Sequence, residues 1–384
     1  MLDKIKKIDW SIVFLLCAFA VISTLLVYSA TLNDPDIKVP ASKSLIIYTI
    51  SFVVFLVVAL LDFRIFIKTS WFTYGFGILL LVAVYLFGAE INGAKGWFKL
   101  PGGFLFQPAE LVKLLIIIAA SAYMAKRNGE QLRLLGDVIP VGVIVFVPFV
   151  LVLIQPDLGN AVIYLVILLG LYWIGNIKYT HVLIGTAVVG AFLTLFFYLF
   201  IHFHDDIKQF AVDHNKKHWV ERIDTFIMPD QVSEDEKYQS KRAKIAIGSG
   251  LLTGDGYLKG NSVHKNFIPF AYSDSIFVVV GEEFGFVGGA VLLMLYFLLI
   301  YRMILISIQS TDLSGSYLIV GIVAMYVFQV FQNIGMFIGL MPITGITLPF
   351  VSYGGTSLLI NMIAIGLVMS VKLHQEKPSM FKEA

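Results

Sequence analysis

The 384-residue sequence has a single cysteine, Cys17, and only 14% of its residues are charged. One cysteine can form no intramolecular disulfide and no cysteine-based metal site, so no resident metal site is predicted. A soluble globule carries about 25% charged residues, and this chain falls well below that. Its net charge of +2 is too small, and its basic residues too scattered, for a nucleic-acid partner.

Hydrophobic residues are abundant instead, at 58% of the chain with a mean hydropathy of +0.85. A membrane-spanning helix needs roughly 20 mostly apolar residues. Such windows recur along the whole chain, which predicts an all-α, polytopic integral membrane protein with about ten transmembrane helices in one domain over 1–384. The expected spans are 11–31, 44–61, 71–89, 104–125, 138–154, 158–174, 179–201, 275–301, 313–341 and 345–371.

The basic residues of the short loops gather on one side of these spans. With the N-terminus in the cytoplasm, only Lys38, Lys43, Lys95 and Lys99 fall in short outer loops, and the Lys and Arg residues of the other short loops and of the termini are cytoplasmic. Short cytoplasmic loops are enriched in Lys and Arg. Both termini are therefore predicted to be cytoplasmic.

The longest loop, approximately 202–274, then faces outward as one large extracellular loop, because long loops cross the membrane largely regardless of their charge. A short helix is expected around Lys237–Ile247. Embedded apolar residues such as Trp219 and Phe267 favour an ordered loop. Long ordered loops are commonly functional.

Ionisable residues inside spans are costly and mark function by default. Here they all fall in the outer half of the membrane, which predicts an outward-facing polar cavity. Glu110 and Lys113 share one helix face at a spacing of three residues, so they can pair. A purely structural pair is an equal alternative to a functional one. The other acidic residues of this half are Asp157, Asp274, Glu282 and Glu283.

Two local patterns point to the same outer face. Residues 341–357 contain Pro342, Pro349 and three glycines, which would break a continuous helix. Irregular backbone at membrane depth persists only where protein or a water-filled cavity satisfies its polar groups. Gln107-Pro108-Ala109-Glu110 and Gln155-Pro156-Asp157 repeat a Gln-Pro-acid pattern, which proline's preference for helix starts explains in part.

Several motifs together resemble the SEDS family of shape, elongation, division and sporulation proteins, over nearly the whole chain. Gln332-Asn333-Ile334-Gly335-Met336 is more similar to the elongation member, RodA, than to the division member, FtsW. The other matching motifs are Asp9-Trp10, Gly96-Trp97, 107–113, 155–159, 238–240, 246–250, 274–277, 281–285 and 342–356.

The resemblance implies a peptidoglycan glycosyltransferase in the bacterial cytoplasmic membrane. Such proteins polymerise lipid II at the outer face, together with a class B penicillin-binding protein that cross-links the strands. An aspartate matching Asp274 is required in the family. The resemblance also implies substrate-binding or cavity roles for Trp97, Glu110, Lys113 and Asp157, and the candidate set is completed by Arg222, Gln239, Ser352 and Tyr353.

The implied chemistry needs a base for the acceptor hydroxyl and positive charge for the departing pyrophosphate. We expect Asp274 to be the base. Lys113 or Arg222, with a divalent cation such as Mg²⁺ or Mn²⁺, is the candidate for the pyrophosphate. One departure is that many members read Pro-Glu-x-His-Thr-Asp where this chain reads Pro269-Phe270-Ala271-Tyr272-Ser273-Asp274.

Two other functions fit a polytopic protein of this kind. A lipid II flippase would work by alternating access around a central site, whereas these charges favour one face. A scaffold without chemistry would recruit the penicillin-binding protein through its spans and outer loop. Loss of partner binding on substitution of Asp274 would favour the scaffold, and lipid transport in proteoliposomes would favour the flippase.

Overall fold

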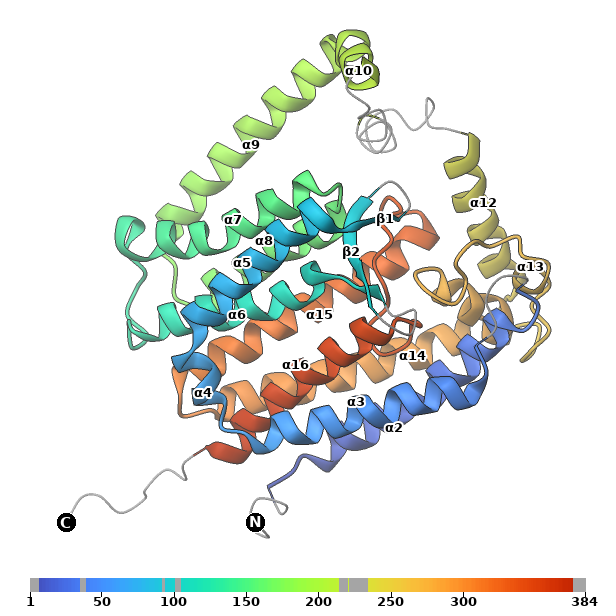
Figure 1. Ribbon diagram of the computed structural model, residues 1–384, viewed down its shortest axis with the longest axis horizontal. Helices are drawn as coiled ribbons and strands as arrows, with labels where there is room; N and C mark the ends of the chain where they lie inside the picture. Colours follow the sequence, from blue (N-terminus) through green and yellow to red (C-terminus); the bar gives the residue numbers. More distant parts are fainter. Residues whose placement is uncertain are drawn as a thin grey trace.

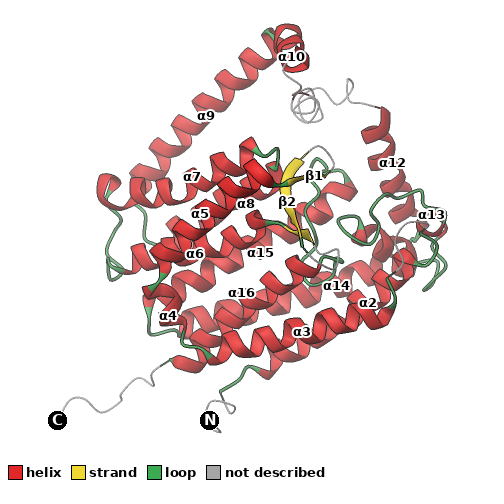
Figure 2. Cartoon of the chain, viewed as in Figure 1, coloured by secondary structure: helices red, strands yellow, loops and turns green. Residues whose placement is uncertain are grey.

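The structure is a computed structural model that describes residues 7–34, 39–91, 94–100, 105–213, 220 and 234–375. Arg222 and Trp219 of the long loop lie outside the described residues. Helices dominate the described chain (Figure 2), so the predicted all-α class is confirmed.

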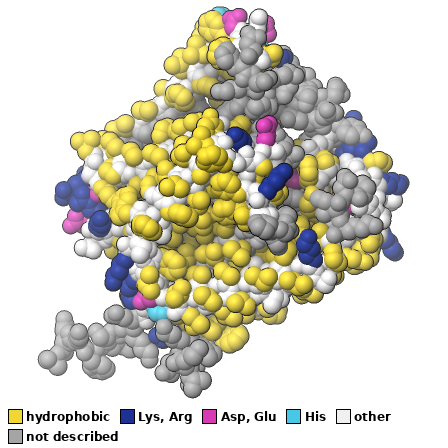
Figure 3. Space-filling model, in the orientation of Figure 1, with side chains coloured by type: hydrophobic (Ala, Val, Ile, Leu, Met, Phe, Trp, Pro, Cys, Tyr) yellow, Lys and Arg dark blue, Asp and Glu magenta, His cyan; other side chains and the backbone are white. Residues whose placement is uncertain are grey.

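The predicted number of about ten spans is also confirmed within the described ranges. Nine helices are long and apolar enough to cross a membrane, and the tenth, α8, is an apolar helix of 17 residues. Hydrophobic side chains cover the broad middle of the molecule (Figure 3), as a lipid-facing surface requires. The spans are α2 (Trp10–Thr31), α3 (Ala41–Leu60), α5 (Ser70–Phe87), α6 (Pro108–Ala125), α7 (Ile139–Ile154) with a preceding π-turn (Leu134–Val138), α8 (Leu158–Ile174), α9 (Tyr179–His202), α14 (Ile276–Gln309), α15 (Leu313–Ile338) and α16 (Gly355–His374).

The start of α2 and the end of α16 lie at the same end of the bundle (Figure 1). There Asp9 joins three spans. The Asp9 carboxylate caps α2 by accepting from the backbone N–H of Ser11 at 3.1 Å. Its Oδ2 also lies 2.5 Å from Arg302 of α14 and 2.6 Å from Lys372 of α16. Burial alone would raise the pKa of Asp9, but the hydrogen bonds from these two cations outweigh it and lower the pKa.

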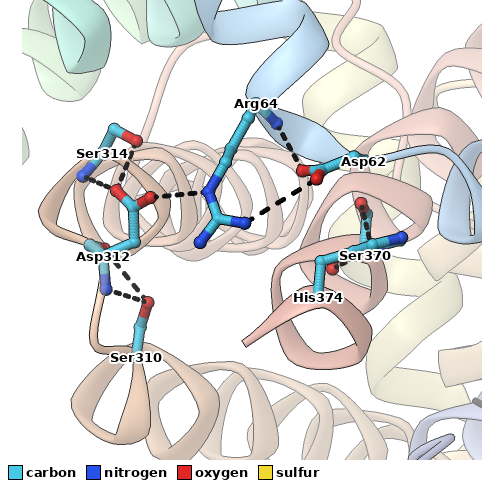
Figure 4. Close-up of polar contacts among 7 residues, drawn as sticks. All are labelled: Asp62, Arg64, Ser310, Asp312, Ser314, Ser370 and His374. Atoms are coloured by element: carbon cyan, nitrogen blue, oxygen red, sulfur yellow. Dashed lines mark hydrogen bonds and ion pairs between the residues drawn. The ribbon is translucent and has the colours of Figure 1, made fainter. Parts of the chain in front are cut away.

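A second link at this end holds the short helix α4 (Phe63–Lys68) against α15 (Figure 4). Arg64 Nε lies 3.2 Å from Oδ2 of Asp312, the residue that caps α15 by accepting from the N–H of Ser314. Arg64 is also within 3.7 Å of Asp62, which caps α4. Charged side chains thus tie the helices together where the apolar band ends.

The opposite end carries the long loop, which contains α10 (His204–Asp213), α12 (Glu234–Ser249) and α13 (Asn261–His264). The predicted helix at 237–247 therefore exists and is longer at both ends. Helix α9 stands away from the bundle and leads to α10 (Figure 1), and its apolar window is not buried in the protein.

Helix α14 is broken at Gly285, whose φ of 63° and ψ of −159° favour glycine. The break frees backbone groups, and the loop that follows α12 binds them. Asp255 N–H donates to the Glu282 carbonyl at 3.0 Å, and Phe286 N–H donates to the Leu251 carbonyl at 2.9 Å. The Glu282 carboxylate accepts from the N–H groups of Ser262 (2.7 Å) and Val263 (3.1 Å). The broken span thereby fixes the long loop.

Some element boundaries differ from the prediction. Residues expected in or before the fourth span form a small antiparallel sheet of β1 (Ala89–Ile91), β2 (Ala94–Lys99) and β3 (Leu105–Phe106) in the order β1-β2-β3. Its register pairs Phe98 with Phe106. A hydropathy window averages over such short strands. Helix α16 begins at Gly355 rather than at 345, because residues 340–354 are not helical.

This irregular segment, residues 340–354, is buried at 346 and 348–352, where four helices satisfy its backbone carbonyls. Asn333 of α15 donates to the Ile346 carbonyl at 2.7 Å, and Ser23 of α2 donates to that of Val351 at 2.7 Å. The hydroxyls of Tyr296 of α14 and Tyr48 of α3 donate to the carbonyls of Pro349 and Phe350. The sequence left open whether protein or a water-filled cavity would satisfy irregular backbone here, and at these four carbonyls protein does so.

The ring of Phe350 anchors the same segment. It stacks on Phe19 of α2 with ring centroids 5.6 Å apart, and it lies 5.4 Å from the ring of Tyr326 of α15. Phe350 has a φ of 64°, which costs a non-glycine residue free energy. Burial of the ring and the bond from Tyr48 offset that cost.

We expect Tyr48→Phe to lower the free energy of unfolding by about 1–3 kcal/mol, because it leaves the buried Phe350 carbonyl without a donor. Tyr85→Phe is the matched control, since Tyr85 is 47% exposed. Thermal unfolding of both purified variants in detergent measures the difference. Equal melting temperatures for the two variants would contradict the role assigned to Tyr48.

Candidate functional site

Asp274 lies immediately before the N-cap of α14, Ser275, at the end of the bundle that carries the long loop. Its side chain is half-buried, and its backbone carbonyl accepts a hydrogen bond from Asn333 Nδ2 at 2.8 Å. The carboxylate faces Gly345 of the irregular segment, where a Cβ would lie 3.8 Å from Oδ2. The Tyr353 N–H also donates to the Tyr272 carbonyl at 2.8 Å. The irregular segment therefore forms a wall beside this carboxylate.

The electrostatic setting of Asp274 suits a base. Desolvation by burial raises its pKa to about 6, against the lowering effect of hydrogen bonds from its own N–H and that of Ser275. A carboxylate with this pKa is mostly ionised at neutral pH and binds protons more strongly than an exposed aspartate. Asp274 can therefore accept a proton.

Glu110 and Lys113 form the ion pair that their spacing predicts. Lys113 Nζ lies 2.8 Å from Glu110 Oε1 in the first two turns of α6, and both side chains are buried. Tyr164 of α8 donates from its hydroxyl to the Ala109 carbonyl at 2.9 Å. The second carboxylate oxygen of Glu110 has no hydrogen-bond partner among the described residues. Helices α6 and α8 are thus bonded to each other beside this buried pair.

Asp157 brings the two Gln-Pro-acid motifs into contact. Gln107 Nε2, from the first motif, donates to Asp157 Oδ2 of the second at 2.7 Å. Asp157 also caps α8, because its Oδ1 accepts from the Asn160 N–H at 3.1 Å and its Oδ2 from Asn160 Nδ2 at 2.8 Å. Burial raises the pKa of Asp157, and the nearby Glu110 adds to that effect while Asn160 and Lys113 oppose it.

The irregular segment joins the Asp157 group to the Asp274 group. Helix α8 approaches it so closely at Gly159 that a Cβ there would lie 2.7 Å from the Ile346 side chain and 3.3 Å from that of Thr344. Thr356, at the start of α16, donates to the Leu105 carbonyl of β3 at 2.8 Å. Helix α8, which Asp157 caps, and the Asp274 carboxylate therefore flank the same stretch of chain.

The other predicted site residues have different positions. Trp97 is half-buried in β2, next to Gly96, where a Cβ would lie 4.0 Å from Gln155 Oε1. Ser352 is committed to a local turn, since its hydroxyl oxygen accepts from the Leu348 N–H at 2.8 Å. Tyr353 packs edge-on against Tyr272, with ring centroids 6.2 Å apart. Gln239 is half-buried on α12, which packs on α14 and α15.

Three amides complete the geometry and were not predicted as site residues. Gln107 and Asn160 bind Asp157, and Asn333 binds the backbone of Asp274. All three stand inside or beside motifs of the sequence. Their residue type could have identified them, because a carboxylate in an apolar environment needs hydrogen-bond donors and an amide side chain near it can supply them.

No group of three or more His, Cys, Asp or Glu side chains that could hold a metal ion occurs within the ranges that the structure describes.

Comparison with known proteins places these features in a family. A family model described as "Cell cycle protein", covering FtsW, RodA and SpoVE, matches residues 5–377. The chain is 32% identical over 377 residues to the peptidoglycan glycosyltransferase MrdB of Escherichia coli K12, covering 97% of this chain and 95% of that protein. It is 29% identical over 432 residues to the peptidoglycan glycosyltransferase RodA of Treponema pallidum, covering 97% and 99%.

Solved structures share the fold. The chain superposes with a TM-score of 0.76 and 27% identity on a chain of a peptidoglycan synthase complex that coordinates polymerization and crosslinking, covering 96% of this chain and 99% of that one. The crystal structure of Thermus thermophilus RodA gives a TM-score of 0.68 and 27% identity, with 96% and 98% covered.

We expect Lys113→Met to lower the free energy of unfolding by about 3–5 kcal/mol, because it leaves the Glu110 carboxylate buried without its cation. The double variant Glu110→Gln/Lys113→Met should recover most of that loss, since it buries no charge. A double-mutant cycle of thermal unfolding measures the coupling. Additive effects of the two single substitutions would show that the pair contributes nothing as a pair.

Proposed function

Because the chain belongs to the FtsW, RodA and SpoVE family of cell cycle proteins, we propose that it is a peptidoglycan glycosyltransferase that polymerises lipid II for cell elongation. The resemblance to SEDS proteins drawn from its motifs is thereby confirmed at the level of the family. The observation that carries the proposal is the half-buried Asp274 at the end of the bundle that bears the long loop, with its pKa raised to about 6.

The orientation follows from the distribution of basic residues. We propose that the end carrying both termini is cytoplasmic, so that Asp274, the sheet and the long loop face outward. Lipid II presents its sugars and pyrophosphate at this surface, with its polyprenyl tail in the hydrocarbon. A site at the outer ends of apolar spans meets all three parts of such a substrate.

In the proposed reaction Asp274 accepts the proton of the acceptor sugar hydroxyl. The hydroxyl oxygen forms the new glycosidic bond as the bond between the donor sugar and polyprenyl pyrophosphate breaks. Desolvation makes the Asp274 carboxylate a stronger base than an exposed one. The departing pyrophosphate takes the bonding electron pair and needs nearby positive charge.

Lys113 and Arg222 are our candidate cations for the pyrophosphate. Lys113 is 1% exposed and bonded to Glu110, so it would reach a phosphate only by exchanging that partner. The described residues supply no three-ligand metal set, so a divalent cation such as Mg²⁺ or Mn²⁺ would be held chiefly by phosphate oxygens.

The proposed partner is a class B penicillin-binding protein that cross-links the new strands. The similar chain with a TM-score of 0.76 belongs to a synthase complex that couples polymerization to crosslinking. The fold and its apolar surface support association within the membrane, because a single-span partner needs only a lipid-facing helix to pack against.

Asp274→Asn should lower the rate of lipid II polymerisation by at least about 100-fold, because the amide cannot accept the proton. Gel analysis of labelled glycan strands made by the purified protein with its partner measures the rate. Asp255→Asn is the matched control, since Asp255 is an exposed aspartate of the same loop. Wild-type polymerisation by Asp274→Asn would refute the base assignment, and dithionite quenching of fluorescent lipid II would then test transport.

The pH dependence of polymerisation should follow the ionisation of Asp274. Its pKa is raised to about 6, so kcat/KM should fall about tenfold per pH unit below that value and level off above it. Folding favours the protonated form, so the stability that this group adds is present at low pH and is lost as the pH rises through about 6. Asp274→Asn should therefore melt no lower than wild type at pH 7.5. A pH-independent rate between 5 and 7 would contradict the assignment.

A further inference from the structure

Asn333 lies in the last two turns of α15 and is fully buried. Its Nδ2 donates two hydrogen bonds, to the Asp274 carbonyl at 2.8 Å and to the Ile346 carbonyl at 2.7 Å. Both acceptors are backbone oxygens, so only the nitrogen side of the amide can serve them. One side chain therefore joins Asp274 and Ile346, which are 72 residues apart in sequence.

The two segments meet at the Asp274 side chain. Gly345, the residue before Ile346, has a φ of 71° and faces Asp274 Oδ2, from which a Cβ would be 3.8 Å away. If the Ile346 and Asp274 carbonyls were no longer held to one amide, the carboxylate could move away from this wall. Water would then reach the carboxylate, and the desolvation that raises its pKa would diminish.

The adjacent residue, Gln332, makes a contrasting contact. It is also buried on α15, and its Nε2 donates to Thr344 Oγ1 at 2.7 Å. Gln332 thus holds the irregular segment through Thr344, whereas Asn333 holds both that segment and the Asp274 backbone. Substituting Gln332 therefore removes a bond to the irregular segment alone. Substituting Asn333 also removes the bond to the Asp274 backbone.

Resting on the proposed function, we propose that Asn333 is the positioning residue for Asp274: its amide clamps the Asp274 backbone to the wall at Gly345 and Ile346, and so sets the place and the desolvation of the base. No common side chain other than asparagine combines this length with two donors on one nitrogen. Serine is too short, and glutamine extends the amide by a methylene.

The test compares Asn333→Ser with Gln332→Ala in the polymerisation assay, using the full-length protein with its partner and lipid II. Misplacement of a reacting group by about 1 Å can cost about 100-fold in rate. Asn333→Ser should therefore lower kcat by tenfold to 100-fold with a smaller change in KM. The acid limb of its pH profile should move from about 6 toward the ordinary aspartate value of about 4.

Gln332→Ala controls for the stability lost with one buried hydrogen bond. In Gln332→Ala the acid limb of the pH profile should stay at about 6, even if this variant melts as low as Asn333→Ser does. An acid limb that stays at about 6 in Asn333→Ser, with a rate equal to that of Gln332→Ala, would overturn the proposal.

Hydrogen–deuterium exchange gives a readout that does not depend on catalysis. In Asn333→Ser the amides of 270–276 and 343–348 should exchange faster together, whereas Gln332→Ala should affect 343–348 alone. If Asp274→Asn keeps full activity but both segments exchange faster in Asn333→Ser, the base assignment fails and the clamp stands. Unchanged exchange at 270–276 would overturn the clamp, whatever the activity. Should Asn333→Ser not fold, Asn333→Gln, which keeps the donors, is measured in the same way.

Discussion

The structure depends on keeping a stretch of non-helical backbone bonded inside an apolar bundle. In the hydrocarbon region an unpaired carbonyl or N–H costs several kcal/mol, so irregular chain persists only where protein supplies partners. Residues 340–354 meet this condition through donors on four helices. Asn333 binds the Ile346 carbonyl, Ser23 that of Val351, Tyr48 that of Phe350 and Tyr296 that of Pro349. Each donor fixes one helix relative to the segment, so the segment organises the bundle around itself.

The candidate site forms where this segment reaches the end of the bundle that carries the long loop. A regular helix pairs most of its backbone groups within itself, whereas the backbone of the irregular segment is hydrogen-bonded to neighbouring elements. Asp274 approaches it at Gly345, and α8, capped by Asp157, approaches it at Gly159. The backbone partners that make the irregular chain tolerable also set the geometry of the carboxylates. The same residues therefore stabilise the irregular segment and position the carboxylates.

The break in α14 applies the same principle to the outer loop. Gly285 interrupts the helix, and the N–H and carbonyl groups that it frees pair with residues 251–256. The Glu282 carboxylate then binds Ser262 and Val263 of the same loop. Asp274 is thus held from both sides, by the loop that precedes it and by the span that it begins. This explains why a costly carboxylate such as Glu282 is kept inside a span.

The sequence by itself determined the number of spans, the placement of Glu110, Lys113, Asp157 and Asp274 at one end, and the pairing of Glu110 with Lys113. Hydropathy, helix periodicity and the high cost of intramembrane charge are local properties, readable without knowing which helices are neighbours. The same reasoning predicted that 341–357 would be irregular, because two prolines and three glycines cannot continue a helix.

Only the tertiary structure decided what those residues touch. Gln107 and Asp157 are 50 residues apart and bonded, and Asn333 reaches both Asp274 and Ile346. Such contacts depend on which helices pack together and on the backbone course of the irregular segment, which no period in the sequence encodes. The short sheet at 89–106 escaped prediction for a related reason, since strands of two to six residues gain their stability from pairing with each other. The charged residues could be found from the sequence, but the residues that orient them by hydrogen bonds depend on the folded chain.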